Sequence, residues 1–187
     1  KGRLELGVGL GWQKEEFDAA GVSFEDRTEI FWETLDICKL LWHDSPISLH
    51  GKHFNFDDIW CHPQPIQGQD LPLLFGLKMT HENAQRIAKV GHGWIPIKTS
   101  RDFISAGQEI LSEAFMKEDR QDQPRIRGQL PTCVDENGVP NIDLTLKELE
   151  KSMAAGLDEI EVFPINFVQA PDDIYKVLQL ISEVKKS

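Results

Sequence analysis

From Leu73 onward the chain alternates short apolar runs with segments of helical periodicity, and this order constrains the fold more than any other feature. Each run is followed by residues whose apolar positions recur at helical spacing. With an earlier run near the start, the apolar segments are 4–8, 73–75, 94–97, 126–134 and 160–163. Repeated strand–helix units predict an α/β fold with a parallel sheet and right-handed crossovers.

Two architectures satisfy this pattern, an open doubly wound sheet and part of a (β/α)8 barrel. A full barrel needs eight units and typically about 250 residues. The chain has 187 residues and about five units, so it falls short of a closed barrel by about three units. An open doubly wound sheet needs no further strand–helix units. The pattern by itself therefore does not decide between the two architectures.

Residues that start or stop helices mark the expected boundaries. Thr80 and Ser100 are N-cap residues, Thr145 to Glu148 forms a capping box in a helix that Gly156 stops, and Pro171 suits the first turn of the last helix. A further helix is expected over 26–42. The residues expected to face the core are Ala84, Ile87 and Ala88; Phe103, Ala106, Gly107, Ile110, Leu111 and Ala114; and Ile174, Val177, Leu178, Ile181 and Val184.

The stretch from about 44 to 71 interrupts this regular order. Pro46, Pro63 and Pro65 exclude a helix, and two strand-like runs flank a Gly51-Lys52 turn. We expect a β-hairpin excursion within one domain that spans residues 1–187. The acidic residues after Gly11 are expected to form a connector.

Composition excludes several classes of partner. The formal net charge is −11, so nucleic acid and anionic membrane surfaces would be repelled. No apolar run approaches the length of about 18 residues that indicates a membrane helix. The three cysteines, Cys38, Cys61 and Cys133, are far apart, as expected for reduced thiols in a cytoplasmic protein.

Two glycine-containing turns are candidate phosphate sites. The run from Gly7 to Gly11 follows a strand, but its third glycine comes one residue too early for a dinucleotide fingerprint. The segment from Phe75 to Thr80 suits an anion better, because free amides and the helix dipole favour a phosphate there and Lys78 adds charge. An ordinary capped strand–helix turn explains the same residues.

Other chemistry finds little support in the sequence. The six histidines do not form the i, i+4 pair with a glutamate that zinc hydrolases use, so we expect no metal site. No G-x-S-x-G elbow is present, and no cysteine has an evident histidine partner. The catalytic residues stay unknown at this point.

Three segments together resemble the bacterial luciferase-like monooxygenase superfamily, particularly its coenzyme F420-dependent branch. They are "GRLELGVGLGW" with the following Glu15-Glu16-Phe17, the aromatic hairpin "HGKHF", and "GHGWIP" at 91–96. The resemblance implies a partial (β/α)8 TIM barrel, made of about five C-terminal βα units and lacking its first strands. It also implies FMN or F420 at the carboxyl ends of the strands.

The resemblance further implies which residues hold the cofactor. The turn at Gly76 and Leu77, with Lys78 and Thr80, would cradle its phosphate; family members often have two glycines where this chain has Gly76 and Leu77. The other residues that the resemblance assigns to the cofactor pocket are Gly9, Gly11, Trp12 and Trp94. In such enzymes reduced FMN activates oxygen and F420 passes a hydride, while the protein orients the reactants and excludes water.

We therefore expect a flavin- or F420-dependent oxidoreductase or monooxygenase that acts on a small organic substrate. The alternative is a non-catalytic flavoprotein, or an inactive barrel fragment that self-associates. An open barrel exposes strand edges and inner apolar faces, which predicts a homo-oligomer. A third interpretation is a complete small open-sheet protein, which would be a stable monomer.

Overall fold

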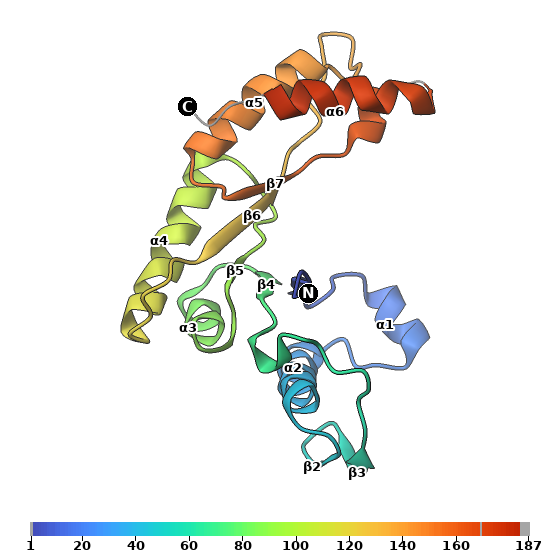
Figure 1. The fold of residues 1–187 in the computed structure, drawn as a ribbon, viewed down its shortest axis with the longest axis vertical. Coiled ribbons are helices and arrows are strands. Elements are labelled where there is room, and N and C mark those ends of the chain that lie inside the picture. Colours follow the sequence, from blue (N-terminus) through green and yellow to red (C-terminus); the bar gives the residue numbers. More distant parts are fainter. Residues whose placement is uncertain (1, 169, 184–187) are drawn as a thin grey trace. The chain divides into compact units, whose positions relative to one another are not determined.

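The computed structural model describes residues 2–168 and 170–183, and the chain divides into two compact units, residues 1–73 and 74–187 (Figure 1). The first unit contains two helices, three strands and a short 3-10 turn. Their bounds are β1 Leu6–Gly9, α1 Lys14–Ala20, α2 Arg27–His43, β2 Ile47–His50, β3 Asn55–Ile59 and η1 Gly68–Asp70. The predicted hairpin and the predicted helix over 26–42 are both confirmed.

Helix α1 corrects the expectation of a connector after Gly11. Its C-cap is Gly21, whose φ of 67° is the left-handed conformation that favours glycine. The Phe17 ring packs edge-on against Phe24 at 5.2 Å between centroids, and Lys14 pairs with Asp18 one turn along. The sequence of this helix has only one large apolar residue, so the helical periodicity was too weak to reveal it.

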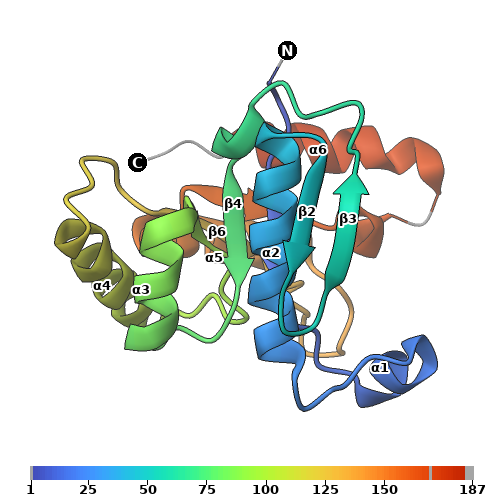
Figure 2. The same cartoon turned by 90° about the horizontal axis from the view of Figure 1, so that it is seen from below.

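The β2–β3 hairpin is antiparallel and lies beside α2 (Figure 2). The carboxylate of Glu33 on α2 accepts hydrogen bonds from the backbone amides of His53 (3.0 Å) and Phe54 (3.2 Å) at the turn. Glu29, one turn earlier, pairs with Lys52 and His53. Two carboxylates of α2 therefore hold the turn of the hairpin.

The second unit alternates strands and helices as the sequence predicts. Strand β5 pairs in parallel with β4 and β6, and β6 pairs in parallel with β7. The bounds are β4 Leu73–Gly76, α3 His81–Val90, β5 Gly93–Trp94, α4 Arg101–Lys117, β6 Arg125–Gln129, α5 Ile142–Ala154, β7 Glu159–Glu161, η2 Pro164–Phe167, η3 Pro171–Asp173 and α6 Ile174–Glu183. This confirms an α/β fold built on a parallel sheet.

The core of this unit lies between the strands and helices α3 and α4, which pack side by side (Figure 1). Trp94, Phe75 and Phe115 are its largest fully buried side chains. On α3 the predicted inward residues are buried as expected. On α4 the buried residues are Ile104, Gly107, Leu111, Ala114 and Phe115.

The predicted face of α4 was therefore partly wrong. Ile104 and Phe115 were missed, whereas Ala106 is exposed. The buried face of α4 is turned about the helix axis relative to the predicted face, because α4 packs against both α3 and the strands. On α6 Val177 is buried, whereas Leu178 is 46% exposed. Val184, which we also expected to face the core, lies outside the described residues.

The start of α5 is also a correction. The N-cap is Asn141, whose side chain accepts from the amide of Leu144 (3.0 Å), so the helix begins before the supposed capping box. The Thr145 hydroxyl instead donates to the Asn141 carbonyl and accepts from the Cys133 amide. Residues 130–141 form a loop, which explains why β6 is shorter than the predicted strand.

The predicted apolar alternation of β6 is confirmed at Ile126 and Gly128, which are buried, whereas the side chains on either side of Ile126 carry charge. Arg125 and Arg127 both pair with Glu159, which faces Arg127 in the register of β7. Strand β7 ends the sheet and is only three residues long, two of which are glutamates. Short, charged edge strands resist pairing with another chain. Self-association therefore stays a prediction, for which this edge provides no support.

Arg120 joins the ends of α3 and α4. Its guanidinium donates to the carbonyls of Ala88 (3.0 Å) and Gly91, lies over the Phe115 ring, and pairs with Asp122. The hydrogen bond from Arg120 is the main cause that lowers the pKa of Asp122 below its usual value.

This contact predicts a pH-dependent stability. Because the folded state lowers the pKa of Asp122, the stabilisation is present above the unfolded pKa of about 4 and is lost as the pH falls through the folded value. Asp122→Asn should lower the urea midpoint at pH 7 slightly, and the difference from the parent should shrink below about pH 4. Glu118→Gln, a nearby exposed carboxylate, is the control. A difference that does not depend on pH would contradict this role.

Candidate functional site

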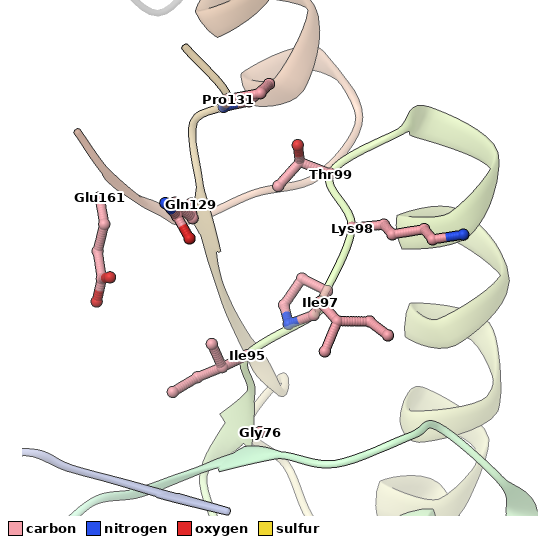
Figure 3. Close-up of a pocket in the computed structure, with 9 residues that line it drawn as sticks. Gly76, Ile95, Ile97, Lys98, Thr99, Gln129, Pro131 and Glu161 are labelled. Atoms are coloured by element: carbon pink, nitrogen blue, oxygen red, sulfur yellow. The ribbon is translucent and has the colours of Figure 1, made fainter. Parts of the chain in front are cut away.

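A cavity of about 600 Å³ lies where the parallel strands of the second unit end. Each of the strands β4 to β7, or the segment that directly follows it, contributes to the wall (Figure 3). The lining residues are Gly76, Ile95, Pro96, Ile97, Lys98, Thr99, Gln129, Pro131 and Glu161. The carboxyl ends of parallel strands are where α/β folds bind their ligands.

The wall combines an apolar surface with a few polar groups. Ile95, Pro96 and Ile97 form the apolar part, and Ile97 is 75% exposed. The amide of Gln129 and the carboxylate of Glu161 come from neighbouring strands (Figure 3). Apolar walls with few oriented polar groups are typical of sites for flat organic molecules, whose faces pack while their edges form hydrogen bonds.

Next to this cavity, the turn from Gly76 to Thr80 is held by side chains. The Trp94 indole N–H donates to the Leu77 carbonyl (2.9 Å), and the Asn83 side-chain amide donates to the Lys78 carbonyl (2.9 Å). Thr80 caps α3, since its hydroxyl accepts from the Asn83 amide (3.2 Å).

These contacts fix the direction of two peptide groups. In a planar trans peptide the N–H points opposite to the C=O. The amides of Lys78 and Met79 therefore point away from Trp94 and Asn83, which hold the carbonyls of Leu77 and Lys78. Two such amides, with the N-terminus of a ten-residue helix beside them, favour an anion.

The structure places the predicted site residues in different environments. Of the eight, Gly76 lines the cavity, while Leu77, Lys78 and Thr80 form the adjoining turn. Trp94 is 1% exposed and packs between β5 and α4, so it reaches the turn only through its indole N–H. Gly9, Gly11 and Trp12 belong to the first unit, where Gly9 ends β1 and Trp12 is 84% exposed.

Sequence reasoning missed most of the cavity wall. Gln129 and Glu161 each end a strand, and Thr99 lies in the segment between β5 and α4; their position near strand ends was the available signal. We predicted a strand that extends to Val134, which places Gln129 inside the strand. Its true position at the end of β6 was therefore not recognised.

Other candidate chemistry is absent from the described part of the chain. Among residues 2–168 and 170–183, no three His, Cys, Asp or Glu side chains gather as metal ligands. All three cysteines are free, and burial raises the pKa of the Cys38 thiol, which disfavours the reactive thiolate. None of the described helices combines the length and apolarity that a bilayer span requires.

Comparison with known families gives one match over most of the chain. Residues 1–138 match the family model described as luciferase-like monooxygenase. Uncharacterized protein Rv0953c of Mycobacterium tuberculosis is 31% identical over 126 residues, which are 67% of this chain and 44% of that protein. Uncharacterized protein y4vJ of Sinorhizobium fredii is 58% identical over 36 residues, or 19% of this chain and 10% of that protein. The chain therefore spans less than half the length of the curated relatives that it matches.

Solved structures share the fold at low sequence identity. An F420-dependent secondary alcohol dehydrogenase, solved with an F420–acetone adduct, has a TM-score of 0.74 at 16% identity over 98% of this chain and 69% of that one. The F420-dependent tetrahydromethanopterin reductase of Methanopyrus kandleri has a TM-score of 0.66 at 14% identity, over 96% and 72%. The oxygenating constituent of 3,6-diketocamphane monooxygenase from Pseudomonas putida, solved with FMN, has a TM-score of 0.64 at 12% identity, over 96% and 68%.

These similarities decide between the two architectures that the sequence left open. The neighbours have the TIM-barrel fold, and this chain matches about three fifths to three quarters of their lengths. The parallel strands of the chain are part of a (β/α)8 barrel that this chain alone does not close.

Proposed function

Because the chain belongs to the luciferase-like monooxygenase family, we propose that it provides part of the cofactor site of a flavin- or F420-dependent oxidoreductase. The substrate would be a small organic molecule. The family match covers residues 1–138, which include the cavity residues up to Pro131.

The observation that carries this proposal is the cavity at the ends of β4 to β7. Its volume of about 600 Å³ lies within the range of about 300–1,000 Å³ typical of cofactor pockets. The Ile95 and Ile97 side chains suit one face of a flavin or deazaflavin ring. Gln129 offers a donor and an acceptor to the polar edge of such a ring.

The turn after β4 is the proposed phosphate site. The outward amides of Lys78 and Met79 donate to phosphate oxygens, and the start of α3 adds the positive end of its dipole. Leu77 is buried at 3% exposure, so its side chain does not obstruct the turn. The position where family members often have a second glycine therefore tolerates leucine here.

A bound cofactor would supply the redox chemistry, either oxygen activation by reduced FMN or hydride transfer by F420. The residues of this chain would orient the ring and the phosphate and exclude water from one side. Gly9, Gly11 and Trp12, in the first unit, are proposed as cofactor-binding residues because the resemblance implies it. A cytoplasmic location and a homo-oligomeric state are proposed on the sequence arguments alone.

Paired titrations of FMN and riboflavin test the phosphate turn. The two ligands share the ring, and only FMN has a phosphate. The Asn83→Ala variant frees the Lys78 carbonyl and should weaken FMN binding about three- to tenfold, because one peptide group loses its orientation. Riboflavin binding should not change. Quenching of flavin fluorescence measures both, and a parallel titration follows F420 by its own fluorescence.

Asn137→Ala, in the loop before α5, is the matched control and should leave both affinities unchanged. An equal loss of FMN and riboflavin affinity in Asn83→Ala would mean that the turn shapes the ring pocket and does not bind the phosphate. If neither flavin nor F420 binds the 187-residue chain, the proposal that this chain holds the cofactor is wrong, and the inactive-fragment alternative gains support.

A further inference from the structure

The cavity at the ends of β4 to β7 has a carboxylate to which the proposed cofactor function assigns no role. Among the lining residues that the structure describes, Glu161 is the one with a negative charge. It ends β7 and is exposed, so a ligand in the cavity can reach its side chain. Within residues 2–168 and 170–183, no group forms an ion pair or a hydrogen bond with this carboxylate.

The register of β6 and β7 explains why this carboxylate has no partner. Side chains two residues apart on a strand share a face, so the pairs 127–159 and 129–161 lie on the same face of the sheet. In the first pair, Arg127 forms an ion pair with Glu159, which also pairs with Arg125. In the second pair, Glu161 faces Gln129, whose amide is neutral. Both arginines of β6 are therefore engaged by Glu159.

Lys98, the cation among the lining residues, does not compensate Glu161 either. In Figure 3 the Lys98 side chain extends toward α4, whereas the side chains of Glu161 and Gln129 lie on the side away from α4. Ile95 lies on that side as well (Figure 3). This end of the cavity therefore combines an apolar side chain, a neutral amide and an uncompensated negative charge.

Such a combination selects a ligand with a positive charge. The attraction between two opposite charges is several-fold stronger near a protein surface than in bulk water, because the effective dielectric constant is lower. An ammonium group also has three N–H donors, so it can donate both to the Glu161 carboxylate and to the side-chain carbonyl oxygen of Gln129. A neutral group would gain only the hydrogen bonds, and a carboxylate would be repelled.

We propose that Glu161 binds a protonated amine of the substrate, while Ile95 contacts the hydrocarbon part of the same molecule. Calling this ligand the substrate rests on the proposed function, whereas the binding of an amine by Glu161 does not. The inference narrows the small organic substrate to molecules with a cationic nitrogen.

Two ligands of nearly the same shape test the site in the 187-residue chain without cofactor. At pH 7, 3-phenylpropylamine is protonated, whereas 3-phenylpropanol has a neutral hydroxyl in the same place. Calorimetric titration at constant ionic strength should show that the amine binds about tenfold more tightly than the alcohol. Equal affinities, or no measurable binding of the amine, would overturn the inference.

Glu161→Gln removes the charge and keeps the shape of the side chain. It should abolish the preference for the amine and change the affinity for the alcohol less than about twofold, which also shows that the cavity is intact. Glu118→Gln, at the C-terminal end of α4 and outside the cavity wall, is the matched control and should keep the preference. An equal loss in both variants would mean that the preference reflects only the net charge of −11, and Glu161 would have no special role.

Gln129→Arg provides a second signature, because it repeats at the strand ends the arrangement of Arg127 and Glu159. The introduced guanidinium group should pair with Glu161 and abolish the preference for the amine, although the carboxylate is still present. A preference that persists in this variant would contradict the binding of the amine by Glu161.

A failure of the cofactor proposal gives a different result. Asn83→Ala should leave the preference for the amine unchanged, because Asn83 holds the turn after β4. If neither flavin nor F420 binds while the preference depends on Glu161, the cofactor proposal is wrong and the cation site stands. If a cofactor binds and the amine is not preferred, the cation site alone is wrong.

Discussion

Replacing Gly93 by alanine should strongly destabilise the second unit. A Cβ atom at this position would lie 2.0 Å from the Arg125 carbonyl oxygen and 2.6 Å from Leu74 Cδ2. Gly93 pairs with Arg125 in the β5–β6 register, so the obstacle is backbone that cannot move without breaking the sheet. We expect a loss of about 3 kcal/mol or more, a large share of the stability of about 5–15 kcal/mol typical of native proteins. Urea unfolding followed by far-ultraviolet circular dichroism measures it.

Gly138→Ala is the matched control for this substitution. Gly138 has a φ of 77°, and a Cβ there would meet no atom within 4 Å. Its replacement should cost only the strain of the left-handed conformation, about 1 kcal/mol. If Gly93→Ala is no more destabilising than Gly138→Ala, the close approach of β5 and β6 does not exist in solution.

Trp94→Ala should also be strongly destabilising, with a loss of about 3–5 kcal/mol. The side chain is 1% exposed, and its ring lies 5.6 Å from that of Phe103 between centroids. The variant would leave a cavity between β5 and α4 and would free the Leu77 carbonyl. Trp60→Ala, at a tryptophan that is 63% exposed, should cost under about 0.5 kcal/mol.

A double-mutant cycle with Gly107 tests the packing of the ring more directly. A Cβ at Gly107 would lie 2.3 Å from two atoms of the Trp94 six-membered ring. Gly107→Ala should therefore be destabilising alone and less so, by about 0.5–3 kcal/mol, in the presence of Trp94→Phe. Additive effects in the urea midpoint would show that the two residues do not touch.

The strand–helix order was predictable because it depends on periodicity, which is local. The run Leu73–Phe75, the helix capped by Thr80 and the Gly51-Lys52 turn all appear as expected. The errors come from contacts between distant residues. Thr145 looks like a helix cap but bonds to Cys133 across a loop, and α4 rotates Ile104 and Phe115 inward to pack against α3 and the strands.

At the candidate site, too, local features were predictable from the sequence and long-range contacts were not. Gly76 and the turn after it were recognisable because strand, glycine and capped helix are consecutive in the chain. Gln129 and Glu161 were not, because only the β6–β7 register places them side by side. The charged set of Arg125, Arg127 and Glu159 could not be foreseen either, since it requires knowing which face each strand turns inward.

The hydrogen bond from Trp94 to Leu77 connects the packing of α4 to the conformation of the turn from Gly76 to Thr80. The ring that rests on Gly107 of α4 is the same ring whose N–H holds the Leu77 carbonyl. A substitution on α4 that shifts the indole would therefore rotate a peptide group in the turn for which we propose phosphate binding. Homologues whose α4 packs differently against Trp94 should therefore also differ in the conformation of this turn.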